Sequence, residues 1–311
     1  MKIAVMGAGG QGCFFGACLA KAGNDVTFIA RGTALEALGR NGVFLKSKDL
    51  GNIAIPVKAT DTPYEVGPVE LVLLCVKYYD LDAASEQIKP MIDDDTLVLP
   101  ILNGVDVAEK VGKIIGEEHL LGGVSWVSTT VEAPGVVSHG GLLRLIFGEL
   151  GGGLSKRVER LDTVLRGAGI ESEKSEDILK AIWEKFCFNA PFNGAMALVK
   201  LPIGLLRESP EAWAMVRKAL VEADEVAKAY GVRLPPEHID TPLKTSMSAV
   251  PWVKSSMLQD LEAGRRLELE ALTGSVVRLG RLRGVSTPVN ETIYAALKPY
   301  ELGRPSLPKM P

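Results

Sequence analysis

Residues 1–12 read MKIAVMGAGGQG, a short apolar run that leads into a Gly-x-Gly-x-x-Gly pattern at Gly7, Gly9 and Gly12. The run Lys2–Met6 predicts a buried strand, and Gln11–Lys21 has Ala and Leu at helical intervals. At such a strand-to-helix turn, the first glycine permits the tight bend, the second lets the backbone approach a pyrophosphate, and the third permits close packing of helix on strand. The helix N-terminus adds amide donors for an anion. The candidate cofactor-binding residues of this turn are Gly7, Ala8, Gly9, Gly10, Gln11 and Gly12.

A dinucleotide-binding turn is the favoured interpretation, and a tight turn without a ligand is the alternative. The end of the second expected strand, Asp25–Ala30, indicates which dinucleotide would bind. Sites specific for NAD carry an acid there, which binds the ribose 2′-hydroxyl. Here the strand is followed by Arg31, and its acid, Asp25, lies at the opposite end. Because a guanidinium suits a 2′-phosphate, Arg31 predicts NADP as the cofactor, unless it is an ordinary solvated arginine.

Composition limits the classes of protein that this chain can represent. Its 311 residues favour two domains, and 47% apolar with 23% charged residues are typical of a folded globular protein. A net charge of −3 argues against a global basic field for nucleic acid, although a local basic patch stays open. The apolar runs are too short for a signal peptide or a membrane span, so a cytoplasmic protein without a membrane partner is expected. The four cysteines have no metal-ligand spacing, which predicts buried thiols and no metal site.

The two halves of the chain differ in their apolar patterns. Up to about residue 150, short β-branched runs alternate with helices, which is typical of a parallel sheet covered on both faces. The turn at Pro134-Gly135 joins strands with no helix between them, so antiparallel strands are expected to extend this sheet. Beyond residue 176 helical spacing replaces the strand signals. The sequence thus predicts an α/β Rossmann domain, a parallel sheet with appended antiparallel strands, as an NADP-binding domain over 1–174. An all-α substrate and catalytic domain follows over 175–311.

These patterns set the bounds of the expected elements. The strands are Lys2–Met6, Asp25–Ala30, Glu70–Val76, Thr96–Leu99, Val124–Val131, Val136–His139 and Leu143–Phe147. The helices of the second half are Ile178–Leu198, Pro210–Tyr230, Ser255–Ala263 and Glu268–Arg283. The proline-rich closing segment, Lys298–Pro311, is expected to run along the surface.

A polar series stands among apolar residues near the start of the second half. Lys185, Asn189 and Asn193 are spaced by four, so a helix places them on one face. Tryptophan and phenylalanine around the lysine would exclude water and lower its pKa, which suits a proton donor. The alternative is a lysine that extends to solvent beside two capping or core-bonded asparagines. Pro191 removes a helix hydrogen bond and is expected to kink the helix between the two asparagines.

A second segment, residues 255–270, combines hydroxyl, amide and acidic groups. Ser256 with Gln259 three residues later predicts a capping box. In one continuous helix, Ser256 and Glu268 would lie about 18 Å apart, which is too far for one small substrate. Either only one of them contacts the substrate or the helix breaks, and Gly264 is the natural position for a break. A second helix is expected to start near Glu268, where an acid in the first turn suits the helix dipole.

Together these motifs resemble the ketopantoate reductase family (2-dehydropantoate 2-reductase) along nearly the whole chain. The resemblance rests on the N-terminal glycines, on Arg31, on K-x-x-x-N-x-x-x-N from Lys185, and on S-S-M-L-Q-D followed by G-R-x-x-E-L over residues 255–269. It implies a Rossmann domain followed by an all-helical domain. It also implies NADPH-dependent reduction of 2-dehydropantoate to pantoate, a step of pantothenate and coenzyme A biosynthesis.

The resemblance also implies roles for single residues. Lys185 matches the catalytic lysine, whose ammonium protonates or polarises the C2 carbonyl oxygen. Glu268 matches a catalytic acid that binds the hydroxyl end of the substrate and helps orient the lysine. Lys77 matches a cofactor-side lysine, although a surface lysine is the alternative. The residues implied to bind substrate are Asn103, Asn189, Asn193 and Ser256, and Asn103 is also implied to contact the cofactor.

Three positions depart from the family pattern. Leu267 stands where the family usually has threonine, Glu270 where it usually has aspartate, and Val253 where it often has asparagine. These departures leave open a broader D-2-hydroxyacid dehydrogenase, a 2-oxoacid reductase of the same family. A non-catalytic NADP-binding sensor is a hypothesis of a different class, which the joint presence of Lys185 and Glu268 disfavours. The expected partner is a small 2-oxo acid as substrate. The oligomeric state stays open, and a homodimer is one possibility.

Overall fold

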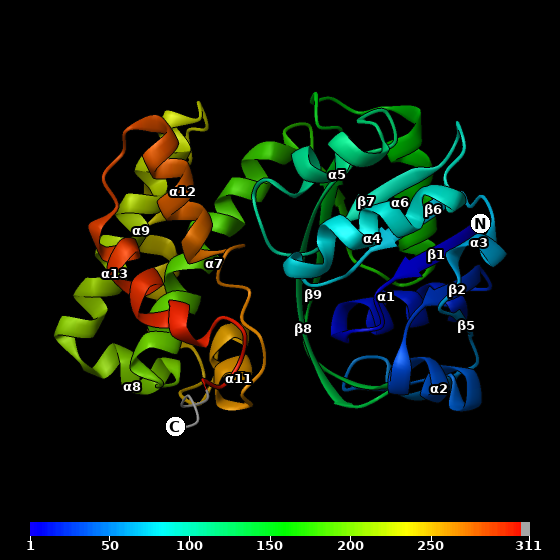
Figure 1. Cartoon of the computed structure of the whole chain (residues 1–311), viewed down its shortest axis with the longest axis horizontal. Helices are drawn as coiled ribbons and strands as arrows, with labels where there is room; N and C mark the ends of the chain where they lie inside the picture. Colours follow the sequence, from blue (N-terminus) through cyan, green and yellow to red (C-terminus); the bar gives the residue numbers. More distant parts are fainter. Residues whose placement is uncertain (306–311) are drawn as a thin grey trace, which may run out of the picture. The chain divides into compact units, whose positions relative to one another are not determined.

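The structure, a computed structural model, describes residues 1–305, and the chain divides into two compact units (Figure 1). The first unit comprises Met1–Leu102 and Asp106–Ala181, and the second comprises Asn103–Val105 and the chain from Ile182 onward. The division falls inside one helix, α7 (Ile178–Val199). The assignment of an NADP-binding domain to residues 1–174 and of a substrate domain to residues 175–311 stays a prediction.

A parallel sheet lies at the centre of the first unit. Its strands are β1 (Lys2–Met6), β2 (Asp25–Ile29), β5 (Lys58–Thr60), β6 (Leu71–Leu74) and β7 (Leu97–Pro100), and they pair in the order β5-β2-β1-β6-β7. Ile3 and Val5 of β1 lie in one apolar cluster, whereas Ala4 and Met6 lie in another, so both faces of the sheet are covered as the apolar strands predict. β1 lies between β2 and β6, so the strand order reverses at β1. At such a switch point, ligands bind outside the carboxyl end of the central strand.

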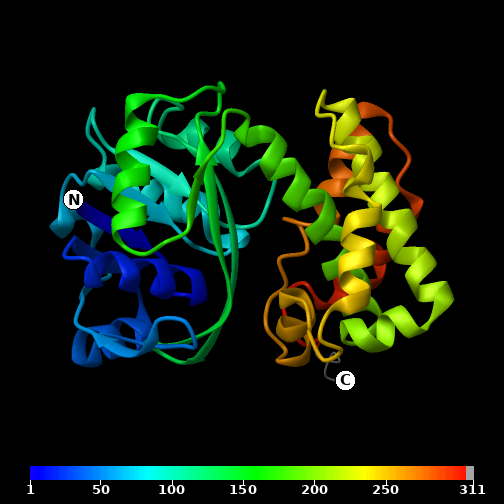
Figure 2. The same ribbon diagram turned by 180° about the vertical axis from the view of Figure 1, so that it is seen from behind.

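A second sheet holds the antiparallel strands. Its members are β3 (Val43–Ser47), β4 (Gly51–Ile55), β8 (Gly122–Ala133), β9 (Val136–Gly148) and β10 (Ser172–Lys174). β8 and β9 pair antiparallel around the predicted turn, where Gly135 has φ +75°, and Figure 2 shows them as a long neighbouring pair. The expectation that they extend the parallel sheet is wrong, because β9 pairs instead with β3 and β10. β9 is also one strand where two were expected, since its pairing with β8 resumes on both sides of the irregular backbone at Gly141 and Leu142.

Helices and short turns connect these strands. The α-helices of the first unit are α1 (Gly10–Lys21), α2 (Gly32–Asn41), α3 (Pro63–Val66), α4 (Leu81–Ile88), α5 (Val107–Ile115) and α6 (Lys156–Gly167). The 3-10 turns are η1 (Tyr78–Asp80) and η2 (Lys89–Met91). Phe14, Phe15 and Ala17 of α1 are fully buried and belong to the same apolar cluster as Ile3 and Val5 of β1.

Among the described residues of the second unit, the regular elements are all α-helices or 3-10 turns. Its elements are α7, α8 (Ile203–Glu208), α9 (Pro210–Ala229), α10 (Asp240–Ser248), α11 (Ser256–Glu262), α12 (Thr273–Arg283), α13 (Pro288–Leu297), η3 (Pro236–His238) and η4 (Lys298–Tyr300). α7 remains a single helix that carries Pro191 in its interior. The sequence-based fold class, a Rossmann domain followed by helices, is confirmed.

The segment between α11 and α12 differs from its prediction. The break at Gly264 is confirmed, since this glycine adopts φ +67° just after α11 ends. The second helix, however, begins at Thr273 rather than near Glu268, so Glu268 lies in an irregular segment before the turn at residues 269–272. A backbone donor of this segment is used for a bond to a distant residue rather than within a helix. Leu267 N donates to Glu301 O at 2.9 Å, across from the C-terminal segment.

The cap of α11 differs from its prediction, and the closing segment begins with a short 3-10 turn. Ser255, not Ser256, caps α11, because its backbone is extended and its hydroxyl accepts from Leu258 N at 3.2 Å. The start of the expected surface tail forms η4 over Lys298–Tyr300; Lys298, Pro299 and Leu302 are exposed, whereas Gly303 is buried. The rest of the tail, residues 306–311, lies outside the described residues.

Candidate active site

The glycine turn after β1 has the geometry of an anion cradle. Gly7 has φ +106°, and a Cβ there would lie 2.8 Å from the carbonyl oxygen of Cys75. A Cβ on Gly12 would lie 2.0 Å from the carbonyl oxygen of Gly7, so the helix can approach the strand only without a side chain. A Cβ on Gly9 would meet nothing within 4 Å. The turn is therefore closed behind Gly7 and Gly12 and open at Gly9, which fits a pyrophosphate bound at the N-terminus of α1.

A pocket of about 300 Å³ adjoins this turn, within the size range of ligand sites. Of the predicted cofactor residues, the structure places Gly7, Ala8, Gly9, Arg31 and Lys77 in its lining. Gly10, Gln11 and Gly12 form the first turn of α1 behind it. Asn103 belongs to the second unit. The pocket thus unites the ends of β1 and β2 with the loop after β6, and it holds donors for an anionic dinucleotide.

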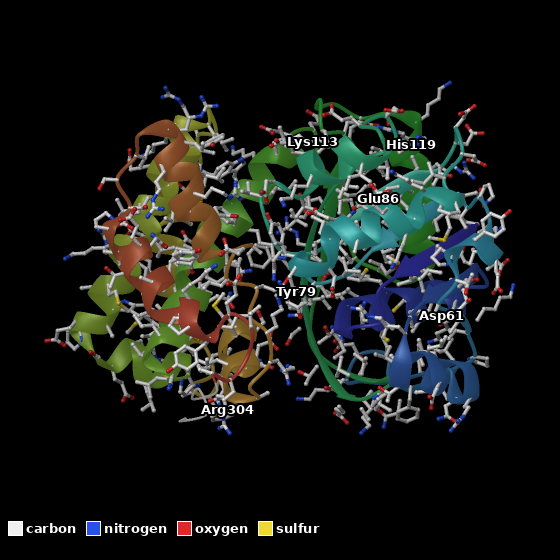
Figure 3. All side chains as sticks on the ribbon, in the orientation of Figure 1. Asp61, Tyr79, Glu86, Lys113, His119 and Arg304 are labelled. Atoms are coloured by element: carbon white, nitrogen blue, oxygen red, sulfur yellow. The ribbon has the colours of Figure 1, made fainter. Side chains whose placement is uncertain are left out.

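Two acids in this pocket were missed by the sequence reasoning. Asp61 follows β5 and is labelled in Figure 3, and Asp80 ends η1. Asp80 Oδ2 lies 3.3 Å from Nη2 of Arg31. A strand at residues 58–60 would have pointed to Asp61, because acids that follow neighbouring parallel strands meet at one edge of a sheet. Asp80 stands only three residues after Lys77, so its closeness to a predicted cofactor residue could have pointed to it.

A chain of side-chain hydrogen bonds links three predicted substrate residues of the second unit with Asn103. Asn189 Nδ2 donates to Asn103 Oδ1 at 3.1 Å, and Asn193 Nδ2 donates to Asn189 Oδ1 at 2.6 Å. Asn193 Oδ1 accepts from the hydroxyl of Ser256 at 3.2 Å and from Met257 N at 3.1 Å. Asn193 is buried, and its amide is fully engaged, since Nδ2 also donates to Asn189 O. Asn189 keeps one N–H and one lone pair for another partner.

Lys185 lies one turn before Asn189 on α7, as the spacing predicts. Burial of its ammonium lowers the pKa of Lys185 to about 8, while the negative charge of Glu268 acts in the opposite direction. Glu268 is itself buried, with a relative exposure of 7%. α7 and the irregular segment after Gly264 thus bring a lysine and a carboxylate together, and the ammonium can lose a proton close to neutral pH.

The three residues that depart from the family pattern, Val253, Leu267 and Glu270, differ in burial and in their contacts. Glu270 accepts from the hydroxyl of Tyr294 at 2.8 Å and pairs with Lys298 at 2.5 Å, so it anchors the C-terminal helices. The Lys298 ammonium and the Tyr294 hydroxyl hold the pKa of Glu270 below its usual value although burial opposes them. Leu267 is buried, and Val253 is exposed in the loop before α11. Glu270 therefore makes structural contacts within the second unit.

The cysteines are unpaired thiols, as expected. Cys13, Cys18 and Cys187 are buried and Cys75 is half-buried. Burial raises the pKa of Cys13 to about 12 and that of Cys18 to about 11, so neither is a thiolate at neutral pH.

Comparison with known proteins establishes the family. The family profile described as Ketopantoate reductase PanE/ApbA matches residues 3–152, and its C-terminal counterpart matches residues 177–301. The chain belongs to the ketopantoate reductase family. A 2-dehydropantoate 2-reductase from Mesorhizobium japonicum is 33% identical, over 96% of this chain and 97% of that protein. The chain is thus a member of an oxidoreductase family that binds pyridine nucleotides.

Solved structures of the ketopantoate reductase family have the same fold. A PanE/ApbA family ketopantoate reductase from Ralstonia eutropha JMP134 superimposes with a TM-score of 0.90 at 32% identity, over 97% of this chain and 98% of that one. D-mandelate dehydrogenase with NADH and anilino(oxo)acetate gives a TM-score of 0.90 at 26% identity, with the same coverage of 97% and 98%. Enzymes with different 2-oxo or 2-hydroxy acids in their names therefore share this architecture.

Among residues 1–305, no group of three or more His, Cys, Asp or Glu side chains is placed to hold a metal ion. Within the same range, none of the helices combines the length and the apolar character that a membrane crossing requires.

Proposed function

We propose that this chain is an NADPH-dependent 2-oxoacid reductase whose substrate is 2-dehydropantoate. The observation that carries the proposal is the pair Lys185 and Glu268, which lies beside a chain of amide and hydroxyl groups. Reduced nicotinamide supplies a hydride to the C2 carbonyl carbon. Lys185 transfers a proton from Nζ to the carbonyl oxygen, so the ketone becomes a secondary alcohol and the lysine becomes neutral. A pKa of about 8 suits a group that is charged at pH 7 and gives up its proton readily.

The polar residues around the lysine bind and orient the substrate. Asn189 retains an N–H that can donate to the carboxylate of a 2-oxo acid. Asn193 acts through Asn189, because all its own donors and acceptors are engaged with protein groups. Glu268 accepts a hydrogen bond from the hydroxyl end of the substrate, since a carboxylate beside the substrate carboxylate would be repelled. Ser256 and Asn103 complete the binding row at its two ends.

The cofactor assignment rests on Arg31. Its guanidinium lines the pocket beside the glycine turn, where it can bind the 2′-phosphate of NADPH, and Lys77 adds a second cation. NADH stands in the name of the D-mandelate dehydrogenase structure, so both nucleotides belong in the test. A cytoplasmic location and a homodimer remain predictions, the latter open to size-exclusion measurement.

A broader 2-oxoacid reductase is the second candidate, which the similarity to D-mandelate dehydrogenase favours. The test follows NADPH absorbance with 2-dehydropantoate, pyruvate and a phenyl-substituted 2-oxo acid. The proposal expects the highest kcat/KM for 2-dehydropantoate. Equal or better turnover of the other acids would move the assignment to the broader enzyme, and no turnover of any of them would favour a nucleotide sensor.

Lys185→Ala tests the assignment of the proton donor. It should lower kcat by about 10²- to 10⁴-fold, as expected for loss of a general acid, while NADPH still binds. Unchanged turnover would remove Lys185 from the mechanism.

A further inference from the structure

The ion pair between Arg31 and Asp80 stands inside the nucleotide pocket. The two side chains come from different elements, since Arg31 precedes α2 and Asp80 ends η1, and both line the pocket with the glycine turn. Nη2 and Oδ2 are 3.3 Å apart. The guanidinium on which the NADPH assignment rests thus already has a carboxylate partner.

The remaining charges of the pocket make it balanced rather than basic. Its charged lining within the described residues consists of two cations, Arg31 and Lys77, and two acids, Asp61 and Asp80. A 2′-phosphate is attracted by the first pair and repelled by the second, because it carries close to two negative charges. A 2′-hydroxyl has no such conflict, and a carboxylate is the group that binds it in NAD sites.

We propose that Asp80 determines nucleotide specificity by competing with the 2′-phosphate for Arg31. The inference rests on the proposed function and deepens it. With NADPH, the guanidinium turns to the phosphate and leaves Asp80 beside an anion. With NADH, the ion pair persists and the pocket stays neutral. This chain therefore binds both nucleotides, and Asp80 narrows the preference for NADPH that Arg31 alone would create.

The exchange of partners is feasible because the ion pair is exposed. The Arg31 side chain has a relative exposure of 82% and that of Asp80 has 37%. Exposed pairs of this kind are weak, so the arginine can leave its partner at small cost. The cost of separating Arg31 from Asp80 then falls on NADPH binding alone, because NADH leaves the ion pair in place.

The test measures dissociation constants of NADPH and NADH by calorimetric titration, without turnover. Asp80→Asn should tighten NADPH about three- to tenfold and should not tighten NADH. Asp82→Asn is the matched control, because it removes the same charge two residues later and outside the pocket lining. It should change neither constant by more than about twofold.

A double variant separates the two ways in which Asp80 could act. In an Arg31→Ala background, the gain from Asp80→Asn should shrink, since the competition for the guanidinium is gone. Weaker NADPH binding by Asp80→Asn would overturn the proposal, because Asp80 would then hold Arg31 in place for the phosphate. An unchanged ratio of NADPH to NADH affinity would also overturn it while the proposed function stands. If the wild-type chain binds neither nucleotide, the proposed function itself fails.

Discussion

At the scale of single residues, the protonation of Lys185 gives a direct test of its role. A proton donor acts only in its protonated form, and burial lowers the pKa of this ammonium to about 8. The rate of reduction should therefore be constant below about pH 8 and fall about tenfold per pH unit above it. A pH–rate profile of kcat/KM measures this. In Lys185→Arg the decline should vanish, because a guanidinium stays protonated throughout this range. The same decline in both proteins would assign it to another group.

The carboxylate of Glu268 should set where that decline begins. Its negative charge raises the pKa of Lys185 against the effect of burial. Glu268→Gln removes the charge and should move the decline to lower pH, besides raising KM for 2-dehydropantoate. Glu270→Gln is the matched control, since Glu270 contacts Tyr294 and Lys298 instead. A shift of equal size in both variants would show that the effect is not specific to Glu268.

Spacing along one helix was the part of the site that the sequence could reveal. Lys185, Asn189 and Asn193 lie on one face of α7 because residues four apart do so in any helix. The bond from Ser256 to Asn193 joins residues 63 apart, and no local pattern encodes it. Which of two adjacent serines caps α11 depends on the backbone that the preceding loop imposes. The sequence therefore named both serines of the motif but assigned the cap to the wrong one.

At the scale of elements, Asn193 joins α7 to the start of α11. Asn193→Ala leaves the buried Met257 N–H without its acceptor, which should lower the free energy of unfolding by about 1–3 kcal/mol. It should also raise KM about tenfold, because Asn189 loses its orienting partner. Urea unfolding and steady-state kinetics measure the two effects.

Ser255→Ala separates stability from substrate binding in this comparison. It removes the α11 cap at a cost of about 1 kcal/mol but keeps the bond from Ser256 to Asn193. Its KM should stay near the wild-type value. An equal rise of KM in both variants would mean that the position of α11, rather than Asn193, governs substrate binding.

The strength of the apolar pattern decides which elements the sequence predicts. β1, β6 and β7 are buried on both faces, so their runs are almost continuously apolar. β4, β5 and β10 were missed because most of their residues are polar or exposed, and β3 was missed although it begins with three apolar residues. The start of α12 was predicted too early. Leu267 N donates to Glu301 O, a residue far along the chain, and no local pattern encodes this bond.

At the scale of the whole molecule, the two proposed binding functions fall on different compact units. The nucleotide pocket is built from the first unit alone, and the acid-base pair with its asparagines belongs to the second. Asn103 precedes the rest of the second unit by many residues in the sequence. It nevertheless belongs to that unit, because Asn103–Val105 groups with it and Asn103 bonds to Asn189. A boundary read along the chain could not assign this short segment, since its partners come 86 residues later.

This division predicts where each ligand protects the backbone from hydrogen exchange. NADP⁺ alone should protect the glycine turn and residues 77–84 most strongly, because these line the nucleotide pocket. Pantoate alone should protect the middle of α7 and the start of α11 most strongly, where Asn189 and Ser256 lie. Exchange measured by mass spectrometry resolves these segments, and Arg31→Ala at the same NADP⁺ concentration serves as the control, in which protection of the first set should fall. Strongest protection of α11 by NADP⁺ alone would contradict a nucleotide site built at the carboxyl end of β1.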